Sequence, residues 1–574
     1  MVGTPRRSLR LRPVLLDLWP ALLAVVLCWP LLTGRGHPLA RDLVFVPRQP
    51  WTDAGIGLGE SAPRAVPLDA VVSTLTAVVD GGLVARLVLP LGLALAGWGT
   101  HRLVRGLGTT GRLVAGGIAV WNPYVVERTA LGQWALLLGY AAIPWLLVAA
   151  GRFREQGRLR DLGATAAWLG LASLTPTGGL LGSATVLVAG AGRIRRTWWL
   201  VGCCALLQLP WVLPALIGTG GGTSDPAGVT LFSSGAEGPP GLLGTVVALL
   251  GTGGIWDAGS VPASRDMFWG PLTAAAAVGV LLLARRALWR SHELRRLTVL
   301  AGAGLVLALA SSLPGGDALM RALVEHVPGA GLLRDAQKFV APYVVLVAAA
   351  AAVCADRAVR TVAGRSTEAV LAVAVLAVAA PLMLLPDGAR ETWSTVTPIR
   401  YPSGLDAAAQ VMEDGGGGDL ATLPWRSYRR FSWGNGLVSS DPAVRWFDQV
   451  VVVSDDLQVG EEIVRGESAR AARLGASLTS GPVAPALAAE GIRWALVYRD
   501  DPSAPDLDLT GLSAVYTDDR MALYEVPNPA PSPPGPSRGQ RALVLAANGV
   551  ALLAVLGGVV AVVLATRRPR KRPR

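Results

Sequence analysis

Long apolar runs separated by short loops constrain this chain more than any other feature of its sequence. The longest reach the roughly 20 residues that a helix needs to cross a bilayer. Only 16% of the residues are charged, against about 25% in soluble domains. We therefore predict a polytopic α-helical membrane protein of about twelve spans. The runs fall at 14–33, 83–98, 113–121, 135–150, 162–192 (two spans), 198–216, 270–283, 297–310, 340–354, 369–385 and 542–565.

The loops between these runs indicate how the spans are oriented. Arginines crowd into alternate short loops, the amino-terminal segment and the tail at 567–574, as the positive-inside rule expects of cytoplasmic segments. The run 162–192 reads either as one span or as a hairpin turning at 175–179. A hairpin keeps Arg193, Arg195 and Arg196 inside, so the charge rule favours two short spans. Both termini are then cytoplasmic, in a multi-pass protein of the plasma membrane.

The chain is basic, with a net charge of +12, but the charge sits in these loops and in the tail. A nucleic-acid-binding protein needs a basic face on a folded domain, and the sequence contains no such domain, so we expect no nucleic-acid partner. The four cysteines lie in or at the ends of apolar runs, and the four histidines are far apart in the sequence. This spacing predicts no Cys/His metal site.

Three domains follow from this pattern. Residues 1–385 form the membrane part, with an outer loop at 34–82, and residues 540–574 form the last span and the basic cytoplasmic tail. Residues 386–539 have no spanning run and end in a linker rich in proline and serine, so we predict an extracytoplasmic α/β domain. Helices are expected at 405–412 and 485–490, and strands in GGDLATLPW, in DQVVVVSDD and in IRWALVYRDD, with a final hairpin turning at 518–519.

The outer loop 34–82 contains the first candidate for chemistry. Asp42 comes soon after the first span, close to the expected bilayer surface, where a carboxylate can accept a proton from an attacking hydroxyl. That hydroxyl would displace a lipid phosphate from a sugar carbon. The alternative is an ordinary solvated aspartate. The end of the loop, 68–79, has apolar residues at helical spacing, which fits a helix lying in the membrane interface.

Two further polar groups flank predicted spans. Arg334 and Lys338 are four residues apart, so a helix would place them on one face, where they suit a lipid phosphate; the alternative is that they only snorkel. In WNPYVVERTALGQW, the Asn-Pro pair should break a helix, and Asn122, Glu127, Arg128 and Gln133 at the outer surface would line a polar pocket or form local ion pairs. Any of Asp225, Glu237, Asp257 and Asp266 can assist, so a divalent cation stays open, although their spacing matches no ligand pattern.

This layout resembles the GT-C class of integral-membrane glycosyltransferases, which use polyprenyl-phosphate sugars on the outer face, usually with inversion. WNPYVVERTALGQW and GLLRDAQKF are similar to segments of actinobacterial arabinofuranosyltransferase-like and mannosyltransferase-like cell-envelope proteins, and 386–539 looks like the outer domain appended to them. The resemblance implies a catalytic role for Asp42, although a single aspartate after arginine replaces the paired acidic motif of some members. The resemblance matches Arg334 and Lys338 to phosphate-contacting residues by position only. Together with the residues argued above, the predicted substrate-binding set is Arg41, Asn122, Tyr124, Glu127, Arg128, Gln133, Arg334 and Lys338.

The function expected from this resemblance is transfer of arabinofuranose or mannose from a polyprenyl phosphate to a cell-envelope glycan or glycolipid. The alternative is a non-catalytic scaffold or a transport partner for envelope lipids. A proton-coupled transporter would need ionisable residues at mid-membrane, and the runs have almost none. An enzyme predicts a cavity that joins Asp42 to Lys338 and is open sideways to lipid. A filled interior with Asp42 facing bulk water would favour the scaffold.

Overall fold

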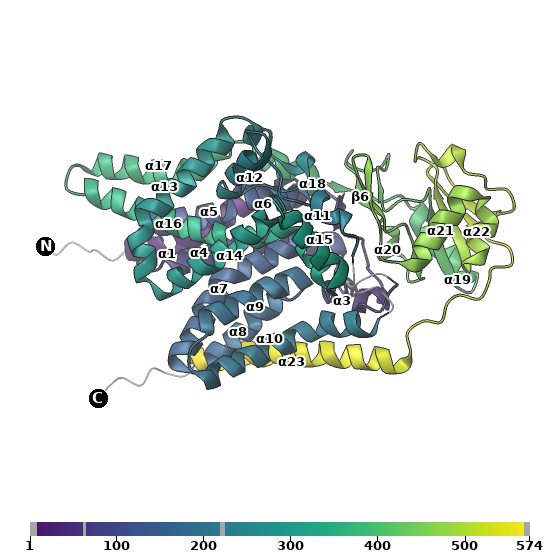
Figure 1. The fold of residues 1–574 in the computed structure, drawn as a ribbon, viewed down its shortest axis with the longest axis horizontal. Coiled ribbons are helices and arrows are strands. Elements are labelled where there is room, and N and C mark those ends of the chain that lie inside the picture. The colour runs from purple at the N-terminus through teal and green to yellow at the C-terminus, as the bar shows by residue number, and fades with distance from the viewer. Residues whose placement is uncertain (1–7, 61–64, 219–223, 568–574) are drawn as a thin grey trace.

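A computed structural model describes residues 8–60, 65–218 and 224–567. The first residues of the basic amino-terminal segment and the tail beyond Arg567 lie outside these ranges. A bundle of helices makes up one part of the molecule, and a smaller α/β domain lies beyond one end of it (Figure 1). The last helix, α23 (Arg538–Arg567), leaves that domain and runs back along one edge of the bundle.

Within the described residues, seven helical segments are long and apolar enough to cross a membrane, and the fold is mostly helical. The other five predicted spans are also helical, but shorter or more charged, and the first is broken at Cys28. The seven are α4 (Gly81–Leu103), α7 (Trp134–Gln156), α10 (Ile194–Ile217), α13 (Trp269–Arg290), α16 (Ala341–Val362) with the turn before it, α17 (Thr367–Leu384) and α23. The five are α1 (Ser8–Leu27) with α2 (Trp29–Thr33), α5 (Thr109–Val120), α8 (Leu159–Ala172), α9 (Pro176–Gly190) and α14 (His292–Ala310).

Two predicted helix breaks are confirmed. The run 162–192 forms the separate helices α8 and α9, and the Thr175 hydroxyl caps α9 by accepting from the backbone N–H of Gly178 at 3.2 Å. At the Asn-Pro pair, α5 ends and the short helix α6 (Pro123–Ala130) begins with Asn122 as its N-cap. Both new helices start with proline, whose missing N–H costs nothing in a first turn.

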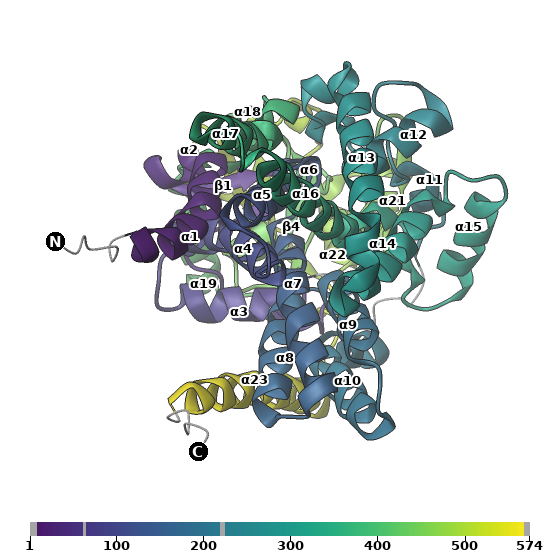
Figure 2. The same ribbon diagram turned by 90° about the vertical axis from the view of Figure 1, so that its left-hand side faces the viewer.

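The helices of the bundle differ in how far they are covered. α7 and α16 are buried on nearly all sides, whereas α17 buries only Pro381 and leaves its other residues partly or fully exposed, as expected of a helix that faces lipid. Figure 2 shows α4, α5 and α7 near the middle, with α8, α10 and α23 along one edge. α1 begins and α23 ends at the bundle end that lies away from the α/β domain (Figure 1).

The α/β domain has a five-stranded sheet of order β11-β12-β10-β4-β7, in which β10 is parallel to β4 and antiparallel to β12. Leu420, Trp494 and Leu496 pack with α19 on one face, while Ala421 and Val497 pack with α21 and α22 on the other, the alternation that a strand imposes. The helices and the hairpin lie close to the predicted positions, but only two residues of DQVVVVSDD form a strand. The elements are α19 (Gly404–Asp414), β4 (Asp419–Leu423), β7 (Val451–Val452), α21 (Ala469–Ser480), α22 (Val483–Ala489), β10 (Ile492–Tyr498), β11 (Ser513–Thr517) and β12 (Met521–Glu525).

The described residues of the loop 34–82 are held between the two parts. Its strand β1 (His37–Ala40) pairs with β2 (Leu43–Val44) and with β3 (Pro398–Ile399), which begins the α/β domain. The predicted interfacial helix is α3 (Leu68–Thr76), which buries Leu68 and Val72 but leaves Leu75 exposed. The loop is therefore folded against both parts.

Candidate active site

Asp42 occupies the turn of the β1–β2 hairpin, next to Arg41. Arg41 has a left-handed backbone (φ 52°), which costs a non-glycine residue about 1 kcal/mol. Backbone bonds hold it there: Arg41 donates to the Val438 carbonyl at 2.7 Å, and its own carbonyl accepts from Ser440 at 2.9 Å. The hairpin turn is thus fixed by β6 (Ser439–Ser440) and the residue before it, far away in the sequence.

The turn between α6 and α7 presses against the same hairpin. The backbone N–H of Asp42 donates to the Leu131 carbonyl at 3.3 Å. Gly132 has φ 83°, and a Cβ on it would lie against the backbone nitrogens of Asp42 and Leu43. Only glycine allows this approach, so the glycine of the ALGQW sequence fixes the distance between the bundle and Asp42.

Each carboxylate oxygen of Asp42 accepts a hydrogen bond from a different part of the fold. Gln133 Nε2 donates to Oδ2 at 3.3 Å, and the Tyr428 hydroxyl, from the α/β domain, donates to Oδ1. The side chain of Arg41 turns away and binds Asp257, Ser260 Oγ at 2.5 Å and the Gly259 carbonyl at 2.6 Å. Arg41 therefore anchors the hairpin and lines the wall beside Asp42.

A chain of polar contacts leads from Asp42 to Lys338. Gln133 accepts from Arg128 at 2.6 Å, and Arg128 binds Asp335 through both ends of its guanidinium at 2.7 and 2.8 Å. Lys338 Nζ lies 3.2 Å from the same Asp335 carboxylate. Burial alone would raise the pKa of Asp335, but Arg128 and Lys338 lower it to about 2. One network of hydrogen bonds and ion pairs thus joins the region predicted to bind phosphate to the predicted catalytic residue Asp42.

Arg334 and Lys338 do not share the face of one α-helix, so that prediction is wrong. Arg334 follows the 3₁₀ segment η4 (Ala330–Leu333), and Lys338 lies in a second one, η5 (Ala336–Val340), with a break between them. The break lets Asp335 turn inward to Arg128, a contact that the local spacing does not reveal. Arg334 lies 3.7 Å from Glu467 and over the Phe232 ring, and both cations still line the same cavity.

Asn122 and Tyr124 support the site from outside the cavity. Asn122 caps α6 by accepting from Val125 N–H at 3.0 Å and donates to the Ile118 carbonyl at 2.8 Å. The buried Tyr124 hydroxyl donates to the Lys338 carbonyl at 2.9 Å. Neither residue lines the cavity, so Tyr124 fixes the backbone that carries Lys338 and Asn122 starts the helix that carries Arg128.

Glu127 and Arg128 are fully buried, which corrects the prediction that they lie at the outer surface and the alternative of local ion pairing. Glu127 Oε2 accepts from the Ile255 N–H at 3.1 Å, and Oε1 has no hydrogen-bond partner among the described residues. Nearby, Glu237 binds Arg265 at 2.5 Å. Burial and the neighbouring Glu237 carboxylate raise the pKa of Glu127 well above its usual value, so we assign Glu127 as neutral.

This assignment predicts that two glutamine substitutions differ sharply. Glu127→Gln replaces a protonated carboxyl by an amide of similar shape and should change the melting midpoint little. Glu237→Gln leaves Arg265 as a buried unpaired charge and should cost about 3–5 kcal/mol. In the unfolded chain the carboxyl of Glu127 has its ordinary pKa of 4.5 and loses its proton above that pH, whereas the folded protein keeps the proton. Above pH 4.5, rising pH should therefore also destabilise wild type relative to Glu127→Gln. Equal melting midpoints for the two variants would contradict the assignment.

A cavity of 1280 Å³ lies between the bundle and the α/β domain and joins Asp42 to Lys338. Its apolar wall comes from the first turns of α7 and α9 and the last turns of α10. Polar groups line the rest, and Asp335, Tyr428 and Arg426 are among those that the sequence did not single out for binding or catalysis, whereas Asp257 is one of the acids that left a divalent cation open. The role of Asp335 could have been predicted from the sequence, because it lies between Arg334 and Lys338. The role of Tyr428 could not, because nothing local in the sequence connects it to Asp42.

Several carboxylates line this cavity, among them Asp42, Asp257, Asp335 and Glu467, and hydrogen bonds or ion pairs engage each of these four. Within the described ranges, no group of three or more His, Cys, Asp or Glu side chains is arranged to hold a metal ion. Three of the four acids that left a divalent cation open have partners: Asp257 lines the cavity paired with Arg41, Glu237 pairs with Arg265, and Asp225 accepts backbone N–H bonds from Ala227 and Arg465. Arginines and a lysine are therefore the charges available to an anionic substrate here.

The helical bundle, the polar loop 34–82 and the α/β domain thus share one cavity. The chain superimposes on the cryo-electron microscopy structure of arabinofuranosyltransferase AftD from Mycobacteria with a TM-score of 0.55 and 18% identity, over 90% of this chain and 40% of that chain. A mutant of AftD gives a TM-score of 0.55 and 19% identity, over 92% of this chain and 42% of that one.

These similarities show a shared fold. The chain spans less than half the length of the AftD chains. No protein-family profile matches the sequence, and no curated protein matches it.

Proposed function

We propose that the protein is an inverting glycosyltransferase that moves a sugar from a polyprenyl-phosphate donor to a cell-envelope glycan or glycolipid. The observation that carries this proposal is the cavity that joins Asp42 to Lys338. A filled interior is what the scaffold alternative predicted. The fold shared with an arabinofuranosyltransferase favours arabinofuranose over mannose as the donor sugar.

The donor fits the cavity in two parts. Lys338 and Arg334 suit the phosphate, as a point charge and as a planar fork respectively. The apolar wall suits the isoprenoid chain, and it includes Trp211 and Leu216 of α10. α10 lies at the edge of the bundle (Figure 2), and Leu216 is 76% exposed, so a lipid chain can enter from the bilayer on this side.

A single displacement then accounts for inversion. The acceptor hydroxyl oxygen forms a bond to the anomeric carbon and its proton passes to Asp42, while the bond from that carbon to the polyprenyl phosphate oxygen breaks. The phosphate departs with the electron pair, and Lys338 and Arg334 stabilise its charge. In this proposal, both termini are cytoplasmic and residues 386–539 are on the outer face of the plasma membrane, as the arginine-rich loops predict.

A direct test combines lipid mass spectrometry with a transfer assay. The purified protein should carry a polyprenyl phosphate or its sugar derivative, and it should move labelled arabinofuranose from decaprenyl-phosphate arabinofuranose to an envelope glycan extract, with inverted configuration. The same assay with a mannosyl donor tests the second sugar. Absence of both a bound lipid and any transfer would overturn the proposal and favour the scaffold.

Lys338 gives a sharper test of donor binding. Lys338→Met should raise the KM for the donor about 10- to 100-fold, because a charged hydrogen bond contributes about 1.5–3 kcal/mol. Folding should be retained, since Arg128 still neutralises Asp335. The matched control is Arg321→Met, a cation on α15 (Gly316–His326) that pairs with Asp317 and does not line the cavity. An unchanged KM in Lys338→Met would contradict the phosphate assignment.

A further inference from the structure

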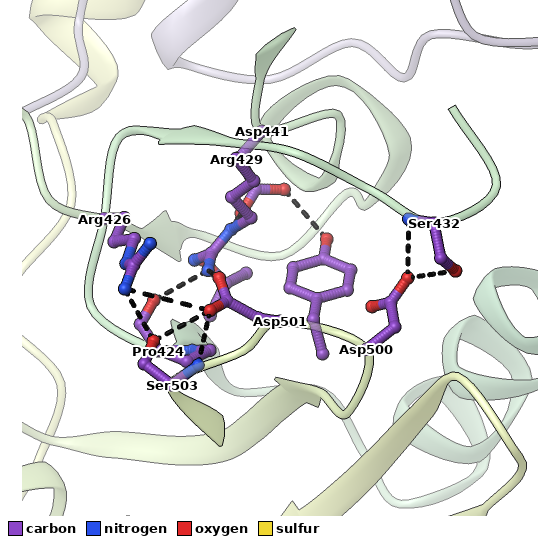
Figure 3. Close-up of polar contacts among 10 residues, drawn as sticks. Pro424, Arg426, Arg429, Ser432, Asp441, Asp500, Asp501 and Ser503 are labelled. Carbon is purple, nitrogen blue, oxygen red and sulfur yellow. Dashed lines mark hydrogen bonds and ion pairs between the residues drawn. The ribbon is translucent and has the colours of Figure 1, made fainter. Parts of the chain in front are cut away.

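A buried ionic cluster in the α/β domain anchors the strand β5 (Tyr428–Arg429). Figure 3 shows Arg429 pointing inward beside Asp441 and Asp501. Its guanidinium donates to Asp441 at 2.8 Å, to the Pro424 carbonyl at 2.7 Å and to the Thr422 hydroxyl at 2.9 Å. Arg429 and Asp441 are both fully buried, so the position of the Arg429 backbone is fixed by the domain core.

This anchor determines where the preceding residue points. β5 pairs with β6 in a register that sets Tyr428 opposite Ser440 and Arg429 opposite Ser439. Because successive side chains of a strand point to opposite faces, an inward Arg429 directs Tyr428 outward. Tyr428 lines the cavity, and its hydroxyl donates to Asp42 Oδ1. The α/β domain therefore reaches the proposed catalytic carboxylate through the side chain of Tyr428.

We infer that Tyr428 is a positioning residue for Asp42, so the α/β domain completes the active site. With Gln133 on Oδ2 and Tyr428 on Oδ1, donors from the bundle and from the domain hold the carboxylate between them. Each oxygen keeps a further lone pair for the acceptor hydroxyl. This inference rests on the proposed glycosyltransferase function, and it adds that the orientation of the base depends on a residue 386 positions away.

The Tyr428 hydroxyl is not needed to attach the domain. The hydroxyl of Tyr401 crosses the same boundary and donates to the Phe45 carbonyl at 3.0 Å, and Arg445 lies 3.4 Å from Asp69. The backbone bonds of Arg41 to Val438 and Ser440 add to these contacts. Loss of one hydroxyl costs about 1 kcal/mol, so the domain should remain docked without it.

The test compares Tyr428→Phe with Tyr401→Phe in the full-length protein. Each variant loses one hydroxyl at the boundary, but only the first loses a contact with Asp42. Tyr428→Phe should lower kcat about 10- to 100-fold, because a misplaced base loses its alignment, and the donor KM should stay within about twofold, since Lys338 and Arg334 are untouched. Tyr401→Phe should leave both constants near wild type, and the two melting midpoints should agree.

The outcomes separate this inference from the proposed function. If wild type transfers sugar but Tyr428→Phe matches Tyr401→Phe in kcat, the inference is wrong and the function stands. A rise in KM without a fall in kcat, or a lower melting midpoint for Tyr428→Phe alone, would make Tyr428 a binding or docking residue and also overturn the inference. If wild type transfers no sugar to any acceptor tested, the proposed function itself fails.

Discussion

Replacing Asp42 by asparagine is expected to lower sugar transfer by about 10²- to 10⁴-fold, which is the contribution typical of a positioned general base. An amide cannot take the proton of the acceptor hydroxyl, so the attacking oxygen stays a weak nucleophile. The loss should appear in kcat, because Lys338 and Arg334 still line the cavity for the phosphate. The measurement is single-turnover transfer from a polyprenyl-phosphate sugar by purified protein.

The asparagine variant should remain folded, because Asp42 has neutral donors. Gln133 and Tyr428 both donate to its carboxylate, and asparagine keeps one oxygen to accept such a bond. Asp53→Asn is a control from the same outer loop: Asp53 pairs with Arg541 at 2.8 Å near the surface, where such a pair is worth little. Activity retained in Asp42→Asn, with Asp53→Asn unchanged, would remove Asp42 from the catalytic role.

Much of the helical fold could be predicted because its signals are local. Apolar length marks the helices, and the Asn-Pro pair at 122–123 and the turn at 175–179 mark where they break. In the α/β domain, the runs that became β4 and β10 are buried on both faces and rich in apolar residues. Each of these features depends on neighbours within a few residues, so the sequence contains the information directly.

The contacts of the site could not be predicted where the two residues that bind each other are far apart in the sequence. Adjacent residues on a helix point about 100° apart, so Glu127 and Arg128 turn to different partners, and these come from 237–265 and 335–337. Tyr428 reaches Asp42 only because a buried arginine orients its strand. Local spacing predicts Arg334 and Lys338 on one helix, but the chain breaks between η4 and η5, where Asp335 turns inward to Arg128.

Asp335→Asn is the second substitution with a large expected effect, here on stability. Arg128 is fully buried, and both ends of its guanidinium bind the Asp335 carboxylate. Removing that charge leaves a buried cation without its counter-charge, which costs about 3–5 kcal/mol. The control is Asp317→Asn, since Asp317 forms an exposed i,i+4 pair with Arg321 that should be worth less than about 1 kcal/mol. Melting midpoints of the purified proteins measure both effects.

The pH dependence identifies the charge on Asp335 as the cause. Burial would raise the pKa of this carboxyl, but Arg128 and Lys338 lower it from 3.8 to about 2, so it contributes about 2 kcal/mol at neutral pH. Because the pKa of Asp335 is lower in the folded protein, its carboxylate stabilises the fold at pH values above 3.8, the pKa in the unfolded chain. This stabilisation is lost as the pH falls towards 2, the pKa in the folded protein. The difference in melting midpoint between wild type and Asp335→Asn should therefore be largest above about pH 5 and become smaller below about pH 4. A gap that is constant with pH would show that lost packing, and not lost charge, is what destabilises the variant.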